Sequence, residues 1–87
     1  MYVVAVYDID VKRGPKALKL FRRYLSWVQN SVFEGELTKA QYAELKSEAT
    51  DLLEGEEDSV ILYNLRARQY MDRETLGEEP GIPGRVL

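Results

Sequence analysis

The spacing of hydrophobic residues changes along the chain, and each spacing is typical of one kind of structural element. Residues 2–7 form an unbroken apolar run, Tyr-Val-Val-Ala-Val-Tyr, and residues 60–63 form a second run, Val-Ile-Leu-Tyr. β-Branched and aromatic side chains in such runs are typical of strands that are covered on at least one face. We therefore predict a first strand that ends near Asp8 and another at residues 58–65. Both are long enough to lie side by side in the middle of a sheet.

Two segments between these strands carry hydrophobic residues three and four positions apart, which is the spacing of a helix. Pro15 opens the first, where the missing N–H of Pro would lack a partner anyway. Thr38 and Gln41 form a capping box before the second. We predict helices at about residues 15–25 and 38–54. Their expected buried stripes are Ala17, Leu18, Phe21, Tyr24 and Leu25 in the first and Tyr42, Leu45, Ala49, Leu52 and Leu53 in the second.

The remaining segments are less regular. Residues 26–37 are rich in strand formers but carry Gln-Asn-Ser in the middle, so one bulged strand or two short paired strands would both fit. Residues 69–71 could form a further short strand. Residues 78–87 contain Pro and Gly at positions that prevent regular structure. We expect one domain over residues 1–77, followed by a Pro/Gly-rich C-terminal tail over residues 78–87.

The order of these elements predicts an α+β fold. Strand, helix, strand pair, helix and strand match the ferredoxin-like βαββαβ sandwich, with two helices on one face of an antiparallel sheet and here a short extra C-terminal strand. The second face of such a sheet is bare. A chain of 87 residues buries little surface on folding, so a second copy covering this face would add stability. We therefore expect a homodimer.

The composition excludes several kinds of chemistry. The chain contains no Cys and no His. It therefore has no disulfide, no thiolate zinc site and no imidazole base, and its chemistry must depend on carboxylates, hydroxyls, Lys, Arg or a bound cation. The first residues lack the basic segment and cleavage site of a secretory signal, and no apolar run reaches membrane-spanning length. We expect a soluble, cytoplasmic protein.

Charge is distributed unevenly, although the formal net charge is only -3. Residues 11–33 contain no acid, whereas residues 34–58 are strongly acidic. The acidic stretch is most simply a solubilising surface. The basic stretch is either a solvated helix face or a surface that contacts nucleic-acid phosphates. Its members are Lys12, Arg13, Lys16, Lys19, Arg22 and Arg23.

Asp8 stands at the end of the first strand and has two interpretations. It is either a solvated acid that opens a loop, or a metal or catalytic ligand held on a rigid support. If two copies of the chain stack near their first strands, the two Asp8 carboxylates would approach each other. A divalent cation shared between them would remove their mutual repulsion.

Three blocks of the sequence carry a resemblance to a known family. They are Tyr-Val-Val-Ala-Val-Tyr-Asp-Ile at residues 2–9, Trp-Val-Gln-Asn-Ser-Val-Phe-Glu-Gly-Glu-Leu-Thr at residues 27–38, and Asp-Ser-Val-Ile-Leu-Tyr at residues 58–63. In this order and spacing the chain resembles the small CRISPR-associated adaptation protein that joins the integrase in spacer acquisition. The resemblance extends through nearly the whole chain, and the middle block is its most specific part.

The resemblance implies a ferredoxin-like homodimer in which Asp8 of the two subunits shares Mg²⁺ or Mn²⁺. It implies a scaffold that holds duplex prespacer DNA and bridges integrase dimers, with the six basic residues named above along the DNA. Ser31 and Phe33 match positions linked to the family's nuclease site. The C-terminal segment of related proteins pairs across the dimer or docks on the integrase, which suggests a role for the tail.

Two functional classes therefore stay open. The first is a nucleic-acid-binding scaffold for spacer acquisition, and the sequence favours it because each chain offers a single candidate acid with only Asp10 nearby as a helper. The second is a metal-dependent phosphodiesterase, an endoribonuclease or an endodeoxyribonuclease, in which the Asp8 pair binds the catalytic metal. Its substrate would be single-stranded RNA or duplex DNA. A toxin-like ribonuclease of similar fold that acts alone is a third interpretation.

Overall fold

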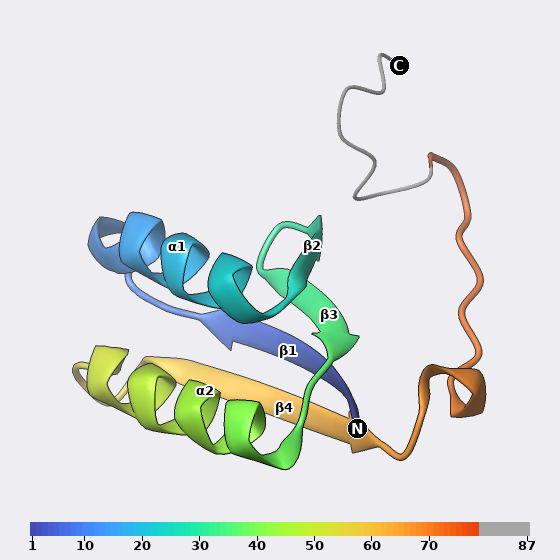
Figure 1. Cartoon of the computed structure of the whole chain (residues 1–87). Helices are drawn as coiled ribbons and strands as arrows, with labels where there is room; N and C mark the ends of the chain where they lie inside the picture. The colour runs from blue at the N-terminus through green and yellow to red at the C-terminus, as the bar shows by residue number, and fades with distance from the viewer. Residues whose placement is uncertain (79–87) are drawn as a thin grey trace.

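A four-stranded antiparallel sheet, in the order β2-β3-β1-β4, forms one layer of the molecule. The computed structural model describes residues 1–78. The strands are β1 (Tyr2–Asp8), β2 (Ser26–Gln29), β3 (Val32–Glu36) and β4 (Ser59–Leu65). The two α-helices, α1 (Gly14–Tyr24) and α2 (Lys39–Leu52), lie side by side over one face of the sheet (Figure 1). The predicted ferredoxin-like βαββαβ order is therefore confirmed.

β1 is a central strand, as its apolar run predicts. Ala5 lies opposite Phe33 of β3 on one side and opposite Leu62 of β4 on the other. β4, in contrast, is an edge strand, because within residues 1–78 no strand pairs with its second side. The prediction that it lies in the middle of the sheet is wrong for the single chain, since hydrophobicity reports burial of the faces and not of the edges.

Residues 26–37 form two short paired strands, which decides between the two alternatives left open by the sequence. The chain reverses at Asn30, whose φ of 44° is left-handed. Asn tolerates this conformation better than most residues. The register of the β2–β3 pair also shifts between Trp27 and Gln29, so the expected irregularity is present in addition to the turn.

The helices begin and end close to the predicted positions. Thr38 Oγ1 accepts a hydrogen bond from the Gln41 backbone N–H at 3.1 Å, and Gln41 Oε1 accepts one from the Thr38 N–H at 2.9 Å, so the capping box is confirmed. The predicted buried stripe of α1 is wrong in one position, because Leu20 is buried and Leu18 is only half-buried. Leu20 lines the groove between the helices together with Leu52, so packing against α2 decides which side of α1 is covered.

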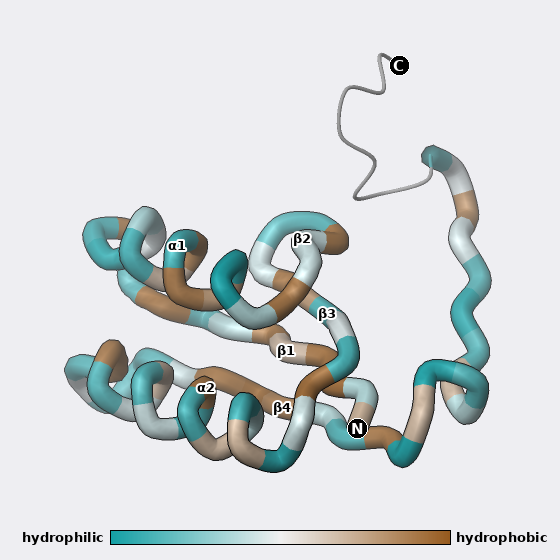
Figure 2. The backbone as a smooth tube through the Cα atoms, in the orientation of Figure 1, coloured by the Kyte–Doolittle hydropathy of each residue, from teal (hydrophilic) through white to brown (hydrophobic). Residues whose placement is uncertain are grey.

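Three aromatic rings form the centre of the core between the sheet and the helices. Tyr7 and Phe21 stack with ring centroids 5.0 Å apart, and Phe21 and Phe33 stack at 5.7 Å. Figure 2 shows the hydrophobic stretches along β1 and β4 and the hydrophilic stretches on the turns of both helices. Side chains alternate along a strand, so Tyr7 and its odd-numbered neighbours Val3 and Ala5 face this core.

The opposite face of the sheet has no helix over it within residues 1–78, and we call it the open face. Strand alternation places Val4 and Val6 of β1 on it, next to Tyr63 and Ile61 of β4 in the observed register. Ile61 is 49% exposed and Tyr63 is 56% exposed. The part of the open face formed by β1 and β4 is therefore apolar and accessible to solvent in the single chain.

The segment after β4 differs from the prediction. Residues 69–71 do not form a strand, because Arg68–Tyr70 is a single turn of 3-10 helix. Residues 71–78 have no helix or strand, although Arg73 forms an ion pair with Glu34 of β3. The predicted Pro/Gly-rich tail, apart from Glu78, lies outside the described residues. Neither α-helix of the described chain has the length and apolar character needed to cross a membrane.

Candidate nucleic-acid and metal interface

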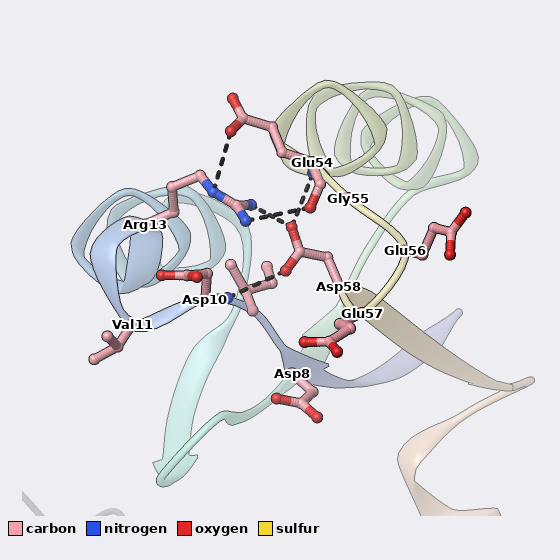
Figure 3. A pocket seen from close by; sticks show the side chains of 10 residues that line it. Asp8, Asp10, Val11, Arg13, Glu54, Gly55, Glu56, Glu57 and Asp58 are labelled. Atoms are coloured by element: carbon pink, nitrogen blue, oxygen red, sulfur yellow. Dashed lines mark hydrogen bonds and ion pairs between the residues drawn. The ribbon is translucent and has the colours of Figure 1, made fainter.

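Asp8 is the last residue of β1 and its side chain is exposed. It lies opposite Ser59, the first residue of β4. Strand alternation places it on the open face, in line with Val4 and Val6. Figure 3 shows its carboxylate pointing away from the Arg13 guanidinium. Asp8 is therefore an accessible acid on a regular strand, at the rim of an apolar surface.

The other residues predicted near the nuclease site fall into two groups. Asp10 lines the same hollow as Asp8, but its Oδ1 already accepts a hydrogen bond from the Lys12 N–H at 2.9 Å. Ser31 lies beside this end of β1, because its carbonyl accepts a hydrogen bond from the Tyr7 N–H at 3.1 Å. Phe33 is fully buried on the helix side of the sheet. The structure thus brings Asp10 and Ser31 close to Asp8 and places Phe33 on the opposite face.

A hollow beside Asp8 is lined by acids from two loops, and we call it the acidic hollow (Figure 3). At its centre Asp58 forms an ion pair with Arg13. The Asp58 carboxylate also accepts hydrogen bonds from the backbone N–H groups of Glu54, at 2.8 Å, and Asp10, at 3.2 Å. The hydrogen bond from Arg13 is the main cause that lowers the pKa of Asp58 from its ordinary value of 3.8 to about 2, and the two N–H donors add to it.

Whether these residues could bind a cation depends on which carboxylates are free to coordinate it. Within residues 1–78 no group of three or more acids is arranged so that it could hold a metal ion. Asp58 is occupied by Arg13 and two N–H groups, and the Asp10 carboxylate caps the turn that follows it. Asp8 is the remaining acid on the strand. Mg²⁺ commonly keeps several waters and binds through one or two carboxylates, so a pair of Asp8 residues from two chains would fit it.

The basic stretch lies mainly on α1 and the turn before it. Lys12, Lys16, Lys19 and Arg22 are all exposed. In the described part of the chain, none of these four side chains forms an ion pair with an acid within 4.0 Å. Lys16 and Lys19 line one shallow surface groove. These four residues, which we call the cationic face, are available to a partner.

Two of the predicted nucleic-acid contacts have partners inside the protein. Arg13 is bound to Asp58, and Arg23 donates a hydrogen bond to Glu48 of α2 at 2.7 Å. The Tyr24 hydroxyl donates to the same Glu48 carboxylate. The Tyr24 hydroxyl and the Arg23 guanidinium lower the pKa of Glu48, and this carboxylate raises the pKa of Tyr24. Arg23 therefore helps to join the two helices, while its side chain stays partly accessible.

Two acids with structural roles, Asp58 beside Asp8 and Glu34 on β3 opposite Val4, are not among the site residues predicted from the sequence. The sequence indicates Asp58 only indirectly. Antiparallel pairing of β1 with β4 brings Asp58, which precedes β4, close to the loop that follows β1. Glu34 is 6% exposed, forms the ion pair with Arg73, and its Oε2 has no hydrogen-bond partner among the described residues. A buried, partly unsatisfied carboxylate is uncommon and indicates a place where a donor is expected.

Comparison with known proteins gives consistent matches over the chain. The family model described as "CRISPR associated protein Cas2" matches residues 1–73. The "CRISPR-associated endoribonuclease Cas2" of Thermotoga maritima is 49% identical over 87 residues, which is 100% of both chains. The protein of the same description from Methanosarcina acetivorans is also 49% identical over 87 residues, with 100% of both chains covered.

Solved structures agree with these sequence matches. The chain superimposes on one described as "Crystal structure of cas2" with a TM-score of 0.86 and 39% identity, covering 100% of this chain and 98% of the other. The Streptococcus pyogenes Cas2 crystal structure gives a TM-score of 0.77 and 34% identity, covering 88% of this chain and 100% of the other. Both the fold and the sequence blocks are therefore shared with these proteins.

Proposed function

Because the chain belongs to the Cas2 family of CRISPR-associated proteins, we propose that it acts in spacer acquisition as a dimeric scaffold. In this role it binds duplex prespacer DNA and bridges copies of the CRISPR integrase. The observation that carries this proposal is the cationic face, Lys12, Lys16, Lys19 and Arg22, on a protein whose net charge is -3. A surface of this kind suits the phosphate backbone of a duplex, which is bound largely through charge.

The open face supports the dimeric part of the proposal. Ile61 and Tyr63 are about half exposed on it, next to Val6 and Val4. A second copy would cover these side chains and bring the two Asp8 residues towards each other. Covering such a face with a second copy is one way in which a small domain gains buried surface.

The test of the scaffold is duplex binding at several salt concentrations. The double variant Lys19→Ala, Arg22→Ala removes two members of the cationic face. Its matched control, Lys39→Ala, Lys46→Ala, removes the same charge from α2. We expect the first variant alone to weaken binding and to reduce the slope of log K against log salt concentration by about 0.9 for each phosphate that is no longer neutralised. Equal slopes for both variants would contradict the proposal.

The dimer is tested by light scattering of the purified chain. Ile61→Asp places a charge on the open face, and we expect it to reduce the mass from two chains to one. Val11→Asp is the matched control, because Val11 is 85% exposed and lies in the turn after β1, outside the sheet. A wild-type mass equal to one chain would refute the dimer.

The second candidate function is a metal-dependent nuclease, either an endoribonuclease or a double-stranded DNase. The exposed position of Asp8 on the open face favours it, and relatives of the chain are described as endoribonucleases. Asp8 from each subunit would hold one Mg²⁺ or Mn²⁺. A bound divalent cation would polarise the scissile phosphate and lower the pKa of a bound water. Asp10 and Ser31 would lie beside this pair.

Asp8→Asn separates the two functions. We expect it to remove metal-dependent cleavage of single-stranded RNA or duplex DNA and to leave duplex binding and integration with the integrase intact. Asp51→Asn, which changes an exposed acid on α2, is the control. Cleavage that survives Asp8→Asn would exclude Asp8 from catalysis. Cleavage of RNA by the wild-type chain, together with no contribution to integration by the integrase, would favour the ribonuclease that acts alone.

A further inference from the structure

Arg13 uses its planar donor group entirely within the protein. Its Nη1 donates to the Leu52 carbonyl at 3.1 Å and forms the ion pair with Asp58. Its Nη2 donates to the Glu54 carbonyl at 3.3 Å, and its Nε lies 3.4 Å from Glu54 Oε2. The side chain is 17% exposed. A guanidinium with all these partners has little capacity left for a phosphate oxygen, so its function differs from that of the cationic face.

Asp58 is the counterpart of Arg13 and is even less accessible. Its side chain is 4% exposed, and its two oxygens receive Arg13, the Glu54 N–H and the Asp10 N–H. One carboxylate thus joins three segments, which are the loop after β1, the end of α2 and the loop before β4. We call the Arg13–Asp58 pair with these hydrogen bonds the loop clamp.

The loop clamp fixes the backbone segment that follows Asp8. β1 pairs with β4 as far as Asp8 and Ser59, which lies next to Asp58. Two residues beyond Asp8, the Asp10 N–H is bound to Asp58. The backbone of Asp8 is therefore held between a strand pair and a hydrogen bond, while its carboxylate stays exposed to solvent. Without the clamp, the backbone at Asp8 would be held only by the pairing of β1 with β4.

We propose that Arg13 and Asp58 are positioning residues, which hold the end of β1 so that Asp8 is presented on the open face in the orientation that a divalent cation requires. The inference depends on the proposed metal-binding role of Asp8. Both side chains use their hydrogen-bonding groups within the protein, so neither is needed as a direct ligand of the cation or the nucleic acid. Partners that orient a metal ligand without touching the metal commonly change metal affinity 10–100-fold when they are removed.

The test uses the full chain labelled with ¹⁵N and titrated with Mn²⁺, which broadens the amide signals of residues near it. The variant is Asp58→Asn, which keeps an acceptor oxygen but loses the charge that Arg13 needs. Glu56→Gln is the matched control, because it removes one negative charge from the same acidic hollow at an exposed residue. Arg13→Lys is a second variant, which keeps the charge but cannot reach all the acceptors, and it serves if Asp58→Asn fails to fold.

We expect the wild type and Glu56→Gln to bind Mn²⁺ at Asp8 with similar affinity, and Asp58→Asn and Arg13→Lys to bind it about 10-fold more weakly. We also expect the ¹⁵N order parameters of Asp8 and Ile9 to fall only in the clamp variants. Unchanged affinity and order parameters in the clamp variants would overturn the inference. Wild-type chain that fails to bind Mn²⁺ at Asp8 would instead refute the proposed metal site, and the order parameters would still decide whether the clamp orders this strand end.

Discussion

Substitution of Phe33 tests whether this residue acts in the core or in the site. The family resemblance places Phe33 near a nuclease site, whereas the structure places it in the core. Its side chain is fully buried on the helix side of the sheet. Its ring stacks on Phe21 at 5.7 Å and on Tyr7 at 6.2 Å. Asp8 lies on the other face, so we expect substitution of Phe33 to act through stability.

The size of the effect follows from this burial. Removing a buried Phe side chain by substitution with Ala commonly costs about 3–5 kcal/mol, since transfer free energy is lost and a cavity forms. A chain of 87 residues has a total stability of roughly 4–13 kcal/mol at about 0.05–0.15 kcal/mol per residue. Phe33→Ala should therefore remove a large part of the free energy of unfolding. Phe33→Leu fills most of the space and should cost less, roughly 1–2 kcal/mol.

Urea unfolding followed by circular dichroism measures both variants, and cleavage is measured on the same samples. We expect the midpoint to fall strongly for Phe33→Ala and slightly for Phe33→Leu, with cleavage by folded Phe33→Leu retained. An unchanged midpoint for Phe33→Ala would refute the assignment to the core. Loss of cleavage in a stable Phe33→Leu variant would show a direct role in the site, contrary to our reasoning.

Three further predictions concern local features. Thr38→Ala removes the accepting oxygen of the capping box and should lower the free energy of unfolding by about 1 kcal/mol in urea titrations, and an unchanged value would show that the cap does not contribute to stability. Gly55→Ala should cost about 1 kcal/mol, because Gly55 has a φ of 78° with open space around it, and a neutral result would mean that this turn relaxes. Asp58 has a pKa of about 2, below its ordinary 3.8, so its contribution to stability should be complete above about pH 4 and disappear as the pH falls towards 2. The difference in urea midpoint between wild type and Asp58→Asn should shrink over this range, and a constant difference would argue against the clamp.

Local chemistry in the sequence determined the elements of this protein. The apolar runs predicted β1 and β4, and Thr38 with Gln41 marked the start of α2. These features depend on neighbours within a few positions, so the sequence displays them directly. The cationic face was also predictable, because residues 11–33 contain no acid and the Lys and Arg residues of α1 lie outside its apolar stripe. The sequence placed Asp8 at the end of the first strand, as the structure shows, while its role as a metal ligand rests mainly on the family resemblance and stays a prediction.

Only the tertiary structure decided which charged residues are available. Arg13 and Asp58 are 45 positions apart in the sequence, and Glu34 and Arg73 are 39 apart, so no local pattern indicates either pair. Antiparallel pairing of β1 with β4 brings Asp58 to the loop after Asp8, where it forms an ion pair with Arg13, a residue that the charge pattern alone assigns to the basic surface. The physical reason is that a side chain's charge is a local property, whereas its partner is chosen by the register of strands that are distant in sequence.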